Sequence, residues 1–482
     1  MISPSKEVFD QIIKNAKAVP IVKEIRGDTE TPITLFQKIS RGKSYLLESG
    51  EGARYSFIGR DPFLRIESRG EEILIEENGI QKKFKGKVLE KTQEILKKYQ
   101  YPNNSELPDF LGGAVGYIGY DILSQYENLV FENEEDMDLP EVHLLLTKEV
   151  VVYDHFHQKI ILVVNVDADK ESYEEGLLKI EDLEKEIREN TAKEEIKNED
   201  SFFTMKSNVS KEEFMDNVTK AKEYIKKGEI DQVVLSQRFE VETSKKPFET
   251  YRELRSLNPS PYMYYLDFEE YKIAGSSPEI LVKATNGEVE TCPIAGTRPR
   301  GESKEIDEER IKDLLSDPKE LKEHMMLVDL AQEDLGRISK EGSIHITELK
   351  KIKKYSHVMH IVSHVKSEIK EELNVIDALI ACLPAGTVSG APKKRALEII
   401  EELENKKRGV YAGAVGYIGF NGNLDMAIAI RTIVFDKNKA YVQAGAGIVE
   451  DSQPEKEYYE TVSKAQALVE ILKTKEALLS QV

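Results

Sequence analysis

The 482-residue sequence has no tryptophan, only two cysteines (Cys292 and Cys382) and a shortage of positive charge. The missing tryptophan excludes nothing, because 21 tyrosines and 16 phenylalanines can fill a core. Two cysteines cannot build the disulfide framework of a secreted protein and suit a reducing cytosol. The N-terminal residues lack the basic and apolar segments of a signal peptide, and no run reaches the ~18 apolar residues of a membrane span. With 88 acidic against 68 basic residues, for a net charge of −20, the chain also lacks the clustered cations that nucleic-acid binding needs. The sequence therefore predicts a cytoplasmic enzyme or regulator with no nucleic-acid partner and no membrane partner.

The order of elements predicts an α+β fold. Residues 181–201 form the most polar stretch in the middle of the chain. Their first half continues a charged helix that begins near Lys170, and their second half loses all apolar periodicity, which is typical of a linker. We therefore place a domain boundary near residue 200, between domains 1–200 and 201–482. Strands and helices mix on both sides without strict alternation, which favours largely antiparallel sheets. The main predicted helices are 87–99, 210–227, 249–256, 305–314, 317–337, 391–405 and 454–475. The main predicted strands are 44–48, 63–67, 72–75, 150–153, 160–166, 231–241, 261–266, 271–275, 287–292, 358–366, 427–435 and 440–443.

One segment is repeated after 300 positions. Residues 113–120 read GAVGYIGY and residues 413–420 read GAVGYIGF, identical at seven of eight positions. Small residues alternating with apolar ones are typical of a strand at a close approach between two sheets. We expect two related strands, one from each half, in a shared core, so that the halves interleave.

Two helices carry glutamates one turn apart. In the helix 317–337, Asp317 is the expected N-cap, and Glu320 and Glu323 share a face. The expected buried stripe of this helix consists of Leu321, Met325, Val328 and Leu335. In the helix 454–475, Glu457 and Glu460 do the same. Taken alone, first-turn glutamates simply favour the helix dipole and solvent. If the two pairs face each other, they supply the hard oxygen ligands that Mg²⁺ prefers.

Three glycine-rich segments and a histidine cluster complete the motifs. Residues 384–392 (PAGTVSGAP) and 443–449 (QAGAGIV) match neither a Walker loop nor a dinucleotide fingerprint, so nucleotide binding is disfavoured. Residues 293–301 (PIAGTRPRG) place two arginines after a strand, either in a plain turn or as a carboxylate clamp. His357, His360 and His364 have no cysteine nearby and do not indicate zinc. His360 at a site edge is the simplest interpretation, with a core or surface histidine as the alternative.

These motifs, together with KELKEHMMLVDL, VMHIVS, AIAIRT, LLESGEGARYSFIG and NPSPYMYYL, occur in an order that resembles the chorismate-utilising enzymes. The resemblance is strongest to the synthase subunit of the anthranilate synthases and covers nearly the whole chain. It implies an α+β sandwich of antiparallel sheets flanked by helices, with two interleaved domains. The first would contribute a regulatory tryptophan site, and the second would bind chorismate.

The resemblance also implies an active site and a cofactor. The expected cofactor is Mg²⁺, and the expected reaction converts chorismate and ammonia to anthranilate and pyruvate. His360 and Thr387 would orient the ring hydroxyl that leaves, and Arg431 and amides near Gly447 would hold a substrate carboxylate. The expected catalytic residues are His360, Thr387, Glu320 and Lys464; the substrate-binding residues are Gln232, Thr297, Thr387, Tyr411, Arg431, Gly445, Gly447 and Lys464; and the metal ligands are Glu320, Glu323, Glu457 and Glu460.

Two positions separate members of the family. Aminodeoxychorismate synthases commonly carry a nucleophilic lysine where this chain has Ala295, and isochorismate synthases carry a lysine base where it has Gln232. A neutral glutamine cannot activate water, which favours attack by ammonia. The ammonia would come from a separate glutamine amidotransferase subunit. The alternatives are an aminodeoxychorismate synthase and a catalytically weak tryptophan-binding paralogue.

Feedback inhibition by L-tryptophan is implied by resemblance alone. The expected site provides a carboxylate for the ligand ammonium and an apolar slot for the indole; the same residues could also be plain core strands. They are Leu47, Glu48, Ser49, Asn258, Pro259, Tyr262, Met263, Val415 and Tyr417. One departure stands out: the family usually reads LARNDLGR, whereas this chain has Gln332 and Glu333 in place of Arg-Asn.

Overall fold

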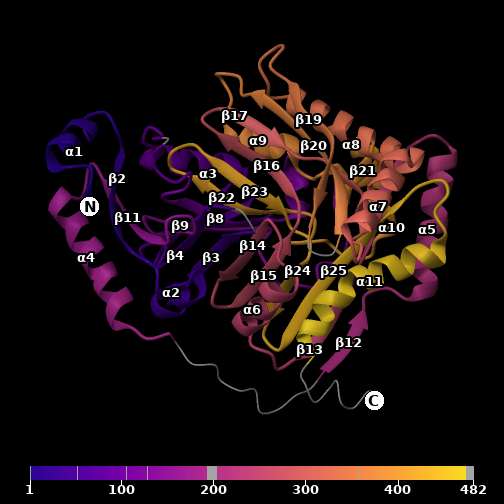
Figure 1. Cartoon of the computed structure of the whole chain (residues 1–482), viewed down its shortest axis with the longest axis horizontal. Helices are drawn as coiled ribbons and strands as arrows, with labels where there is room; N and C mark the ends of the chain where they lie inside the picture. Colours follow the sequence, from indigo (N-terminus) through magenta and orange to yellow (C-terminus); the bar gives the residue numbers. More distant parts are fainter. Residues whose placement is uncertain are drawn as a thin grey trace.

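The computed structural model describes residues 2–50, 53–104, 106–127, 129–192, 203–355 and 358–473. Within them the chain forms two large antiparallel sheets flanked by helices, as the α+β prediction requires (Figure 1). No helix of these residues is long and apolar enough to cross a membrane. The predicted boundary near residue 200 lies outside the described residues and stays a prediction.

The first sheet contains thirteen strands of the described chain. In spatial order they are β1 (Ile2–Ser3), β2 (Ala18–Arg26), β11 (Lys159–Asp167), β10 (Glu149–Asp154), β4 (Tyr55–Arg60), β3 (Ser44–Ser49), β14 (Tyr262–Asp267), β15 (Tyr271–Ser277), β24 (Thr432–Asp436), β25 (Lys439–Ile448), β13 (Gln232–Thr243) and β12 (Phe203–Ser207), with β21 (Gly390–Ala391) beside β13.

The second sheet contains twelve strands, again counted within the described residues. Their order is β18 (Ile294–Pro299), β20 (Val358–Glu368), β17 (Glu288–Thr291), β16 (Ile280–Thr285), β23 (Leu424–Ile428), β22 (Ala414–Gly419), β8 (Gly113–Ile118), β9 (Val142–Thr147), β5 (Leu64–Arg69), β6 (Glu72–Glu77) and β7 (Ile80–Lys85), with β19 (His345–Lys354) beside β20.

Helices cover the outer faces of the sheets. The α-helices are α1 (Lys6–Ile12), α2 (Pro32–Ile39), α3 (Val88–Leu96), α4 (Tyr173–Glu189), α5 (Lys211–Lys226), α6 (Pro247–Leu257), α7 (Lys304–Ser316), α8 (Pro318–Gly336), α9 (Val375–Cys382), α10 (Lys393–Leu403) and α11 (Pro454–Leu472), and 3-10 turns span Lys97–Tyr99, Tyr120–Gln125 and Gly386–Val388. The helices predicted at 210–227, 249–256, 305–314, 317–337 and 391–405 are confirmed to within a few residues.

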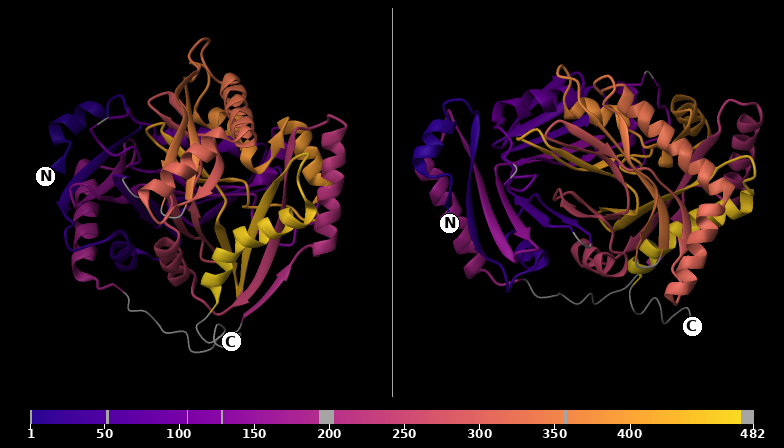
Figure 2. Two further views of the ribbon diagram at one scale, coloured as in Figure 1. Left: turned by 45° about the vertical axis from the view of Figure 1, so that its right-hand side comes forward. Right: turned by 45° about the horizontal axis from the view of Figure 1, so that its top comes forward.

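Both sheets are built from the two halves of the chain. In the first sheet, β3 pairs with β14, and in the second, β8 pairs with β22. The N-terminal strands thus continue directly into strands from beyond residue 200, and the two views of Figure 2 show the indigo and yellow ends of the chain on opposite sides of one body. The prediction of interleaved halves is confirmed.

The repeated segments are the two strands β8 and β22, which lie side by side. They pair antiparallel, with Gly116 opposite Gly416 and Gly113 opposite Gly419. A Cβ atom at Gly116 would lie 2.0 Å from the carbonyl oxygen of His143, on the neighbouring strand β9. The glycines therefore permit close approach between strands of one sheet; the expectation that they mark a close approach between two sheets was wrong.

Buried polar aromatic groups join the two sheets face to face. The Tyr45 hydroxyl on β3 lies 2.7 Å from Thr147 Oγ1 on β9, and the Tyr271 hydroxyl on β15 lies 2.7 Å from His143 Nδ1. Since each pair spans the two sheets, they satisfy polar groups that water cannot reach in the sandwich core.

The strand predicted at 427–435 was wrong. The chain instead leaves the second sheet after Ile428 and enters the first at Thr432, so that two strands replace one. Arg431, just before β24, has a φ of +52°, a backbone conformation incompatible with a continuous strand. The apolar residues on both sides of Arg431 and Thr432 hid this crossing, because strands of both sheets are buried at this point.

The buried stripe predicted for α8 was partly wrong. Val328 and Leu335 are buried as expected, whereas Leu321 and Met325 are only partly covered. His324 takes the buried position instead, with its Nε2 atom 2.6 Å from Ser363 Oγ. A hydrogen bond inside the core lets a polar side chain replace an apolar one.

Candidate active site

A cavity of about 630 Å³ opens between α8, α11 and the C-terminal strands of both sheets. Every residue predicted for catalysis, substrate binding or metal binding lines it: Gln232, Thr297, Glu320, Glu323, His360, Thr387, Tyr411, Arg431, Gly445, Gly447, Glu457, Glu460 and Lys464. Segments more than 200 residues apart in the sequence therefore converge on one site. His357 lies outside the described residues, and His364 does not line the cavity.

Helix α8 brings two of the carboxylates. Asp317 caps it, accepting hydrogen bonds from the backbone amides of Lys319 and Glu320, and Pro318 occupies the first helical position. Because α8 begins at this position, Glu320 and Glu323 lie one turn apart and both face the cavity. Glu320 accepts a hydrogen bond from Arg298 at 3.1 Å, and burial raises the pKa of Glu323.

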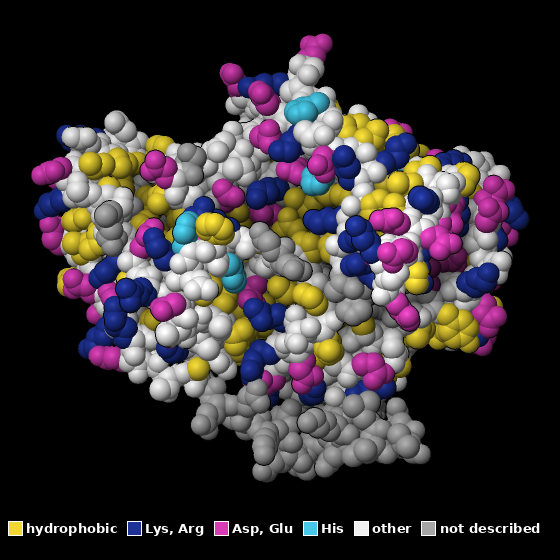
Figure 3. Space-filling view, in the orientation of Figure 1, with side chains coloured by type: hydrophobic (Ala, Val, Ile, Leu, Met, Phe, Trp, Pro, Cys, Tyr) yellow, Lys and Arg dark blue, Asp and Glu magenta, His cyan; other side chains and the backbone are white. Residues whose placement is uncertain are grey.

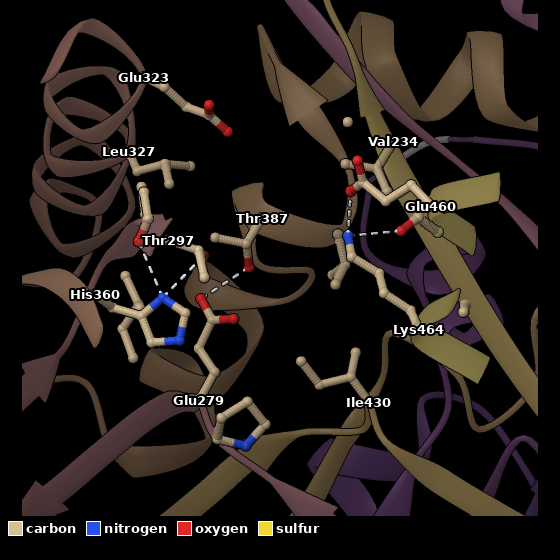
Figure 4. Close-up of a pocket in the computed structure, with 18 of the residues that line it drawn as sticks. Val234, Glu279, Thr297, Glu323, Leu327, His360, Thr387, Ile430, Glu460 and Lys464 are labelled. Atoms are coloured by element: carbon tan, nitrogen blue, oxygen red, sulfur yellow. Dashed lines mark hydrogen bonds and ion pairs between the residues drawn. The ribbon is translucent and has the colours of Figure 1, made fainter. Parts of the chain in front are cut away.

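Helix α11 brings the facing pair. Burial raises the pKa of Glu457, and Glu460 forms an ion pair with Lys464, Nζ to Oε1 2.7 Å. Lys464 also donates to the Gly445 carbonyl at 3.0 Å, which fixes its ammonium at the cavity wall (Figure 4). The charge of Glu460 also contributes to the raised pKa of Glu323, so the two helices place their carboxylates within electrostatic range.

The donor set has the chemistry that Mg²⁺ prefers, which is carboxylate oxygen from few residues. In the described part of the chain, no three histidine, cysteine or acidic side chains converge as metal ligands. Glu320 and Glu460 instead contact Arg298 and Lys464. Burial and neighbouring carboxylates both raise the pKa values of Glu323 and Glu457. A cation bound between them would offset this repulsion and favour the ionised carboxylates.

Arg431 supplies a positive charge without a counter-ion. Its guanidinium lies in the cavity and donates to the Lys464 carbonyl at 3.3 Å, and no ion pair to a carboxylate is found for it among the described residues. Burial lowers the pKa of this arginine, which still stays protonated because guanidinium is so basic. A buried cation of this kind calls for an anion from outside the chain.

His360 presents a neutral nitrogen to the cavity. It lies on β20 opposite Thr297, and its Nδ1 atom is 3.0 Å from the Gly296 carbonyl, to which it must donate. Burial lowers the pKa of His360, so the imidazole is neutral and its Nε2 atom carries a lone pair. The side chain can therefore accept a proton.

Glu279 is a cavity residue that could not be recognised from the sequence. It lies just before β16 and is buried, with its Oε1 atom accepting a hydrogen bond from Thr387 Oγ1 at 2.9 Å. Burial raises the pKa of Glu279 to about 8, so it holds its proton at neutral pH. Figure 4 shows Glu279, Thr387 and His360 on one side of the cavity and Lys464 and Glu460 on the other. A single glutamate without a partner motif gave no signal in the sequence.

Gly447 keeps the cavity open beside Gln232. A Cβ atom there would lie 2.6 Å from the amide nitrogen of Gln232, which donates to Glu323 at 3.3 Å. The side-chain oxygen of Gln232 is buried and has no partner in the described residues. Glycine at 447 therefore leaves an amide group free to contact a ligand.

The unusual pair Gln332 and Glu333 does not reach this cavity. Glu333 is exposed and Gln332 half-buried on the outer side of α8. The neighbouring Asp334 is buried and ion-paired with Lys393 at 2.7 Å, which ties the end of α8 to the start of α10. The departure from the family pattern therefore leaves the cavity wall unchanged.

The residues expected for tryptophan binding lie on β3, β14 and β22 and just after α6; the Glu48 side chain faces α6, whereas Tyr417 faces the first sheet. Met263 on β14 pairs with Glu48 on β3, and Tyr417 on β22 packs near Phe57 of the facing sheet at a ring distance of 5.8 Å. The Glu48 carboxylate already accepts hydrogen bonds from the Tyr251 hydroxyl and Arg255. None of this group lines the large cavity: Leu47, Glu48, Ser49, Asn258, Pro259, Tyr262, Met263, Val415 and Tyr417.

An unpaired arginine beside a protonated carboxyl and a neutral imidazole is what an enzyme needs to bind and transform a small organic anion. Comparison with known proteins identifies the family of enzymes to which the chain belongs. Residues 42–470 match the family model described as chorismate binding enzyme. Anthranilate synthase component 1 from Acetivibrio thermocellus is 50% identical, over 98% of this chain and 99% of that protein.

Solved structures agree. Anthranilate synthase component I from Streptococcus pneumoniae aligns with a TM-score of 0.78 at 39% identity, covering 88% of this chain and 93% of that one. The menaquinone-specific isochorismate synthase from Escherichia coli shares the fold, with a TM-score of 0.72 at 19% identity, 96% of this chain and 100% of that chain being covered. The chain belongs to the chorismate-binding enzyme family and, within it, to the anthranilate synthase component 1 group.

Proposed function

We propose that this chain converts chorismate and ammonia to anthranilate and pyruvate, as the first step toward tryptophan, with Mg²⁺ as cofactor. The observation that carries the proposal is the cavity that combines the unpaired Arg431 with the acid Glu279 and the base His360. The 50% identity to anthranilate synthase component 1, which extends over 98% of this chain, supports the choice of reaction.

Substrate binding follows from charge. Arg431 would hold the carboxylate of the enolpyruvyl side chain, and backbone amides near Gly447 would complete its contacts. Mg²⁺, when bound by Glu320, Glu323, Glu457 and Glu460, would hold the ring carboxylate and stabilise charge that develops there.

Proton transfer uses the two groups with displaced pKa values. Glu279, protonated at neutral pH, would give its proton to the ring hydroxyl as that group leaves, with Thr387 keeping the carboxyl oriented. His360, whose Nε2 atom is unprotonated, would accept the ring proton when pyruvate is eliminated and the ring becomes aromatic. This assigns His360 as a base, in contrast to the hydroxyl-orienting role expected from the sequence.

The nucleophile is ammonia. At position 232 a lysine could remove a proton from water, whereas the amide of Gln232 cannot, and it can still accept a hydrogen bond from ammonia through its free oxygen. We infer a separate glutamine amidotransferase subunit as the source, consistent with the component 1 name of the relatives.

The test is anthranilate fluorescence from the purified chain with chorismate, ammonium and Mg²⁺. Anthranilate should form, and glutamine should replace ammonium only when a glutaminase subunit is added. Mass spectrometry separates this outcome from aminodeoxychorismate. A folded protein that binds chorismate but forms no anthranilate would refute the proposal.

Feedback inhibition by tryptophan is part of the same proposal. The group around Glu48 and Tyr262 lies outside the active-site cavity, so a ligand there would act at a distance. Arg255 contacts Glu48, and a ligand ammonium would have to compete with that contact. Replacing Arg255 by Gln should therefore strengthen inhibition, so that a lower tryptophan concentration halves the rate.

A further inference from the structure

A cysteine outside the cavity is joined to a histidine and a glutamate. Cys292 lies between β17 and β18, and its Sγ atom is 3.6 Å from Nε2 of His364 on β20. The other ring nitrogen, Nδ1, hydrogen-bonds the Glu290 carboxylate. The strand pairing produces this order, because Thr291 is opposite Val365 and Glu290 opposite Lys366.

His364 lies between the other two groups and hydrogen-bonds both of them. Hydrogen bonds with Cys292 and then Glu290 raise the pKa of His364 to about 10, so the ring is an imidazolium at neutral pH. His364 thus places a positive charge and a proton donor beside the Cys292 sulfur. The arrangement is not a metal site, because Cys292 and Glu290 contact opposite ring nitrogens of His364, and no group of three such side chains in the described residues is placed to hold a metal ion.

The second cysteine has none of these features. Cys382 is buried at the end of α9, and burial raises the pKa of its thiol to about 12. It is therefore an internal control in the same molecule.

Space around Cys292 limits what can react. The residue is 8% exposed and lines a cavity of about 40 Å³, which also includes Cys382 and the active-site residues Glu279 and Thr387. Such a volume admits molecules near the size of water and excludes bulky thiols and disulfides.

We propose that Cys292 is a peroxide-reactive thiol whose oxidation slows the reaction in the neighbouring active site. The sulfur attacks one oxygen of hydrogen peroxide, forming an S–O bond as the O–O bond breaks. The departing hydroxide takes a proton from the His364 imidazolium and leaves as water. The sulfur loses two electrons to become a sulfenic acid, and the peroxide is reduced.

The effect on catalysis rests on the proposed function and follows from position. The added oxygen would occupy the small cavity that borders Glu279 and Thr387. Cys292 also lies two residues before β18, whose Gly296 carbonyl accepts a hydrogen bond from His360. Oxidation would thus disturb both the acid and the base of the active site.

The test exposes the full-length chain to hydrogen peroxide with dimedone and locates the label by mass spectrometry. Cys292 should be labelled and Cys382 should not. His364→Gln should slow labelling about tenfold or more, because it removes the proton donor for the departing hydroxide. Glu290→Gln should slow it as well, and Cys382→Ser should leave it unchanged. Equal labelling of both cysteines, or an unchanged rate in His364→Gln, would overturn the proposal.

A second readout follows anthranilate formation during oxidation. Activity should fall severalfold in step with labelling, recover with dithiothreitol, and persist in Cys292→Ser. Full labelling without loss of activity would overturn the link to the active site. Labelling does not depend on chorismate, so a labelled protein that never forms anthranilate counts against the proposed function and not against the modification site.

Discussion

Replacing Glu279 by Gln should lower activity and at the same time raise stability. The carboxyl is buried, and its contact is a hydrogen bond from Thr387 at 2.9 Å, which a glutamine oxygen can also accept. The shape of the site is preserved, and only the proton is lost. If Glu279 is the general acid, turnover should fall by about 10² to 10⁴.

The gain in stability comes from the raised pKa. The Glu279 carboxyl titrates near 4.5 in the unfolded chain and at about 8 in the folded one. Between these two pH values the folded state binds more protons than the unfolded state. The stability contributed by Glu279 is therefore present below pH 4.5 and is lost as the pH rises toward 8. Glutamine has no such dependence. Relative to wild type, the variant should therefore gain about 2.5 kcal/mol between pH 5.5 and 7.5, at about 1.36 kcal/mol per pKa unit.

The assay compares urea unfolding of both proteins at these two pH values by far-UV circular dichroism, since the chain has no tryptophan to report by fluorescence. Anthranilate fluorescence at saturating ammonium gives the turnover of each protein. Thr387→Val is the matched control, because it removes the hydrogen bond but keeps the carboxyl. A variant with more than a tenth of wild-type turnover, or with the same pH dependence of stability as wild type, would refute the reasoning.

Four other substitutions and the removal of metal have defined outcomes. Arg431→Gln should raise the KM for chorismate about 10- to 100-fold, because it removes a charge-assisted contact; an unchanged KM would remove it from the binding site. Glu323→Gln should abolish Mg²⁺-dependent turnover with an unchanged circular dichroism spectrum, and near-normal activity would exclude it as a ligand. Asp334→Asn and Lys393→Met each break a buried ion pair and should cost about 3–5 kcal/mol in urea unfolding; smaller losses would mean that water reaches the pair. Adding EDTA should weaken chorismate binding measured by calorimetry, and equal affinity without metal would contradict the metal site.

Local patterns in the sequence were enough to predict most helices and the interleaving of the two halves. The capped start of α8 is determined by Asp317 and Pro318, which lie next to each other in the chain, and the repeated GAVGYIG segments identify two strands that pair. The sheet assignment of a strand is not local. The apolar run 427–435 is divided at Arg431, whose backbone conformation depends on two sheets meeting there.

The same limit applies to the active site. Paired glutamates and glycine-rich loops can be recognised from spacing and family resemblance, and all of them line the cavity. Glu279 could not be recognised, because its role depends on burial and on a hydroxyl 108 residues away. Cys292 and His364 are 72 residues apart and become neighbours only through strand pairing.

The charges of the cavity explain why a chain with a net charge of −20 can bind a dianion. With Glu279 protonated, four carboxylates of the cavity face Lys319, Arg431 and Lys464, so without metal the site opposes an anionic substrate. Lys464 is already paired with Glu460, which leaves Arg431 to hold one substrate carboxylate. The second carboxylate needs another cation, and the glutamates that disfavour an anion in the cavity are the groups that would bind it. A metal bound there and the substrate would stabilise each other, because neither charge would be balanced without the other.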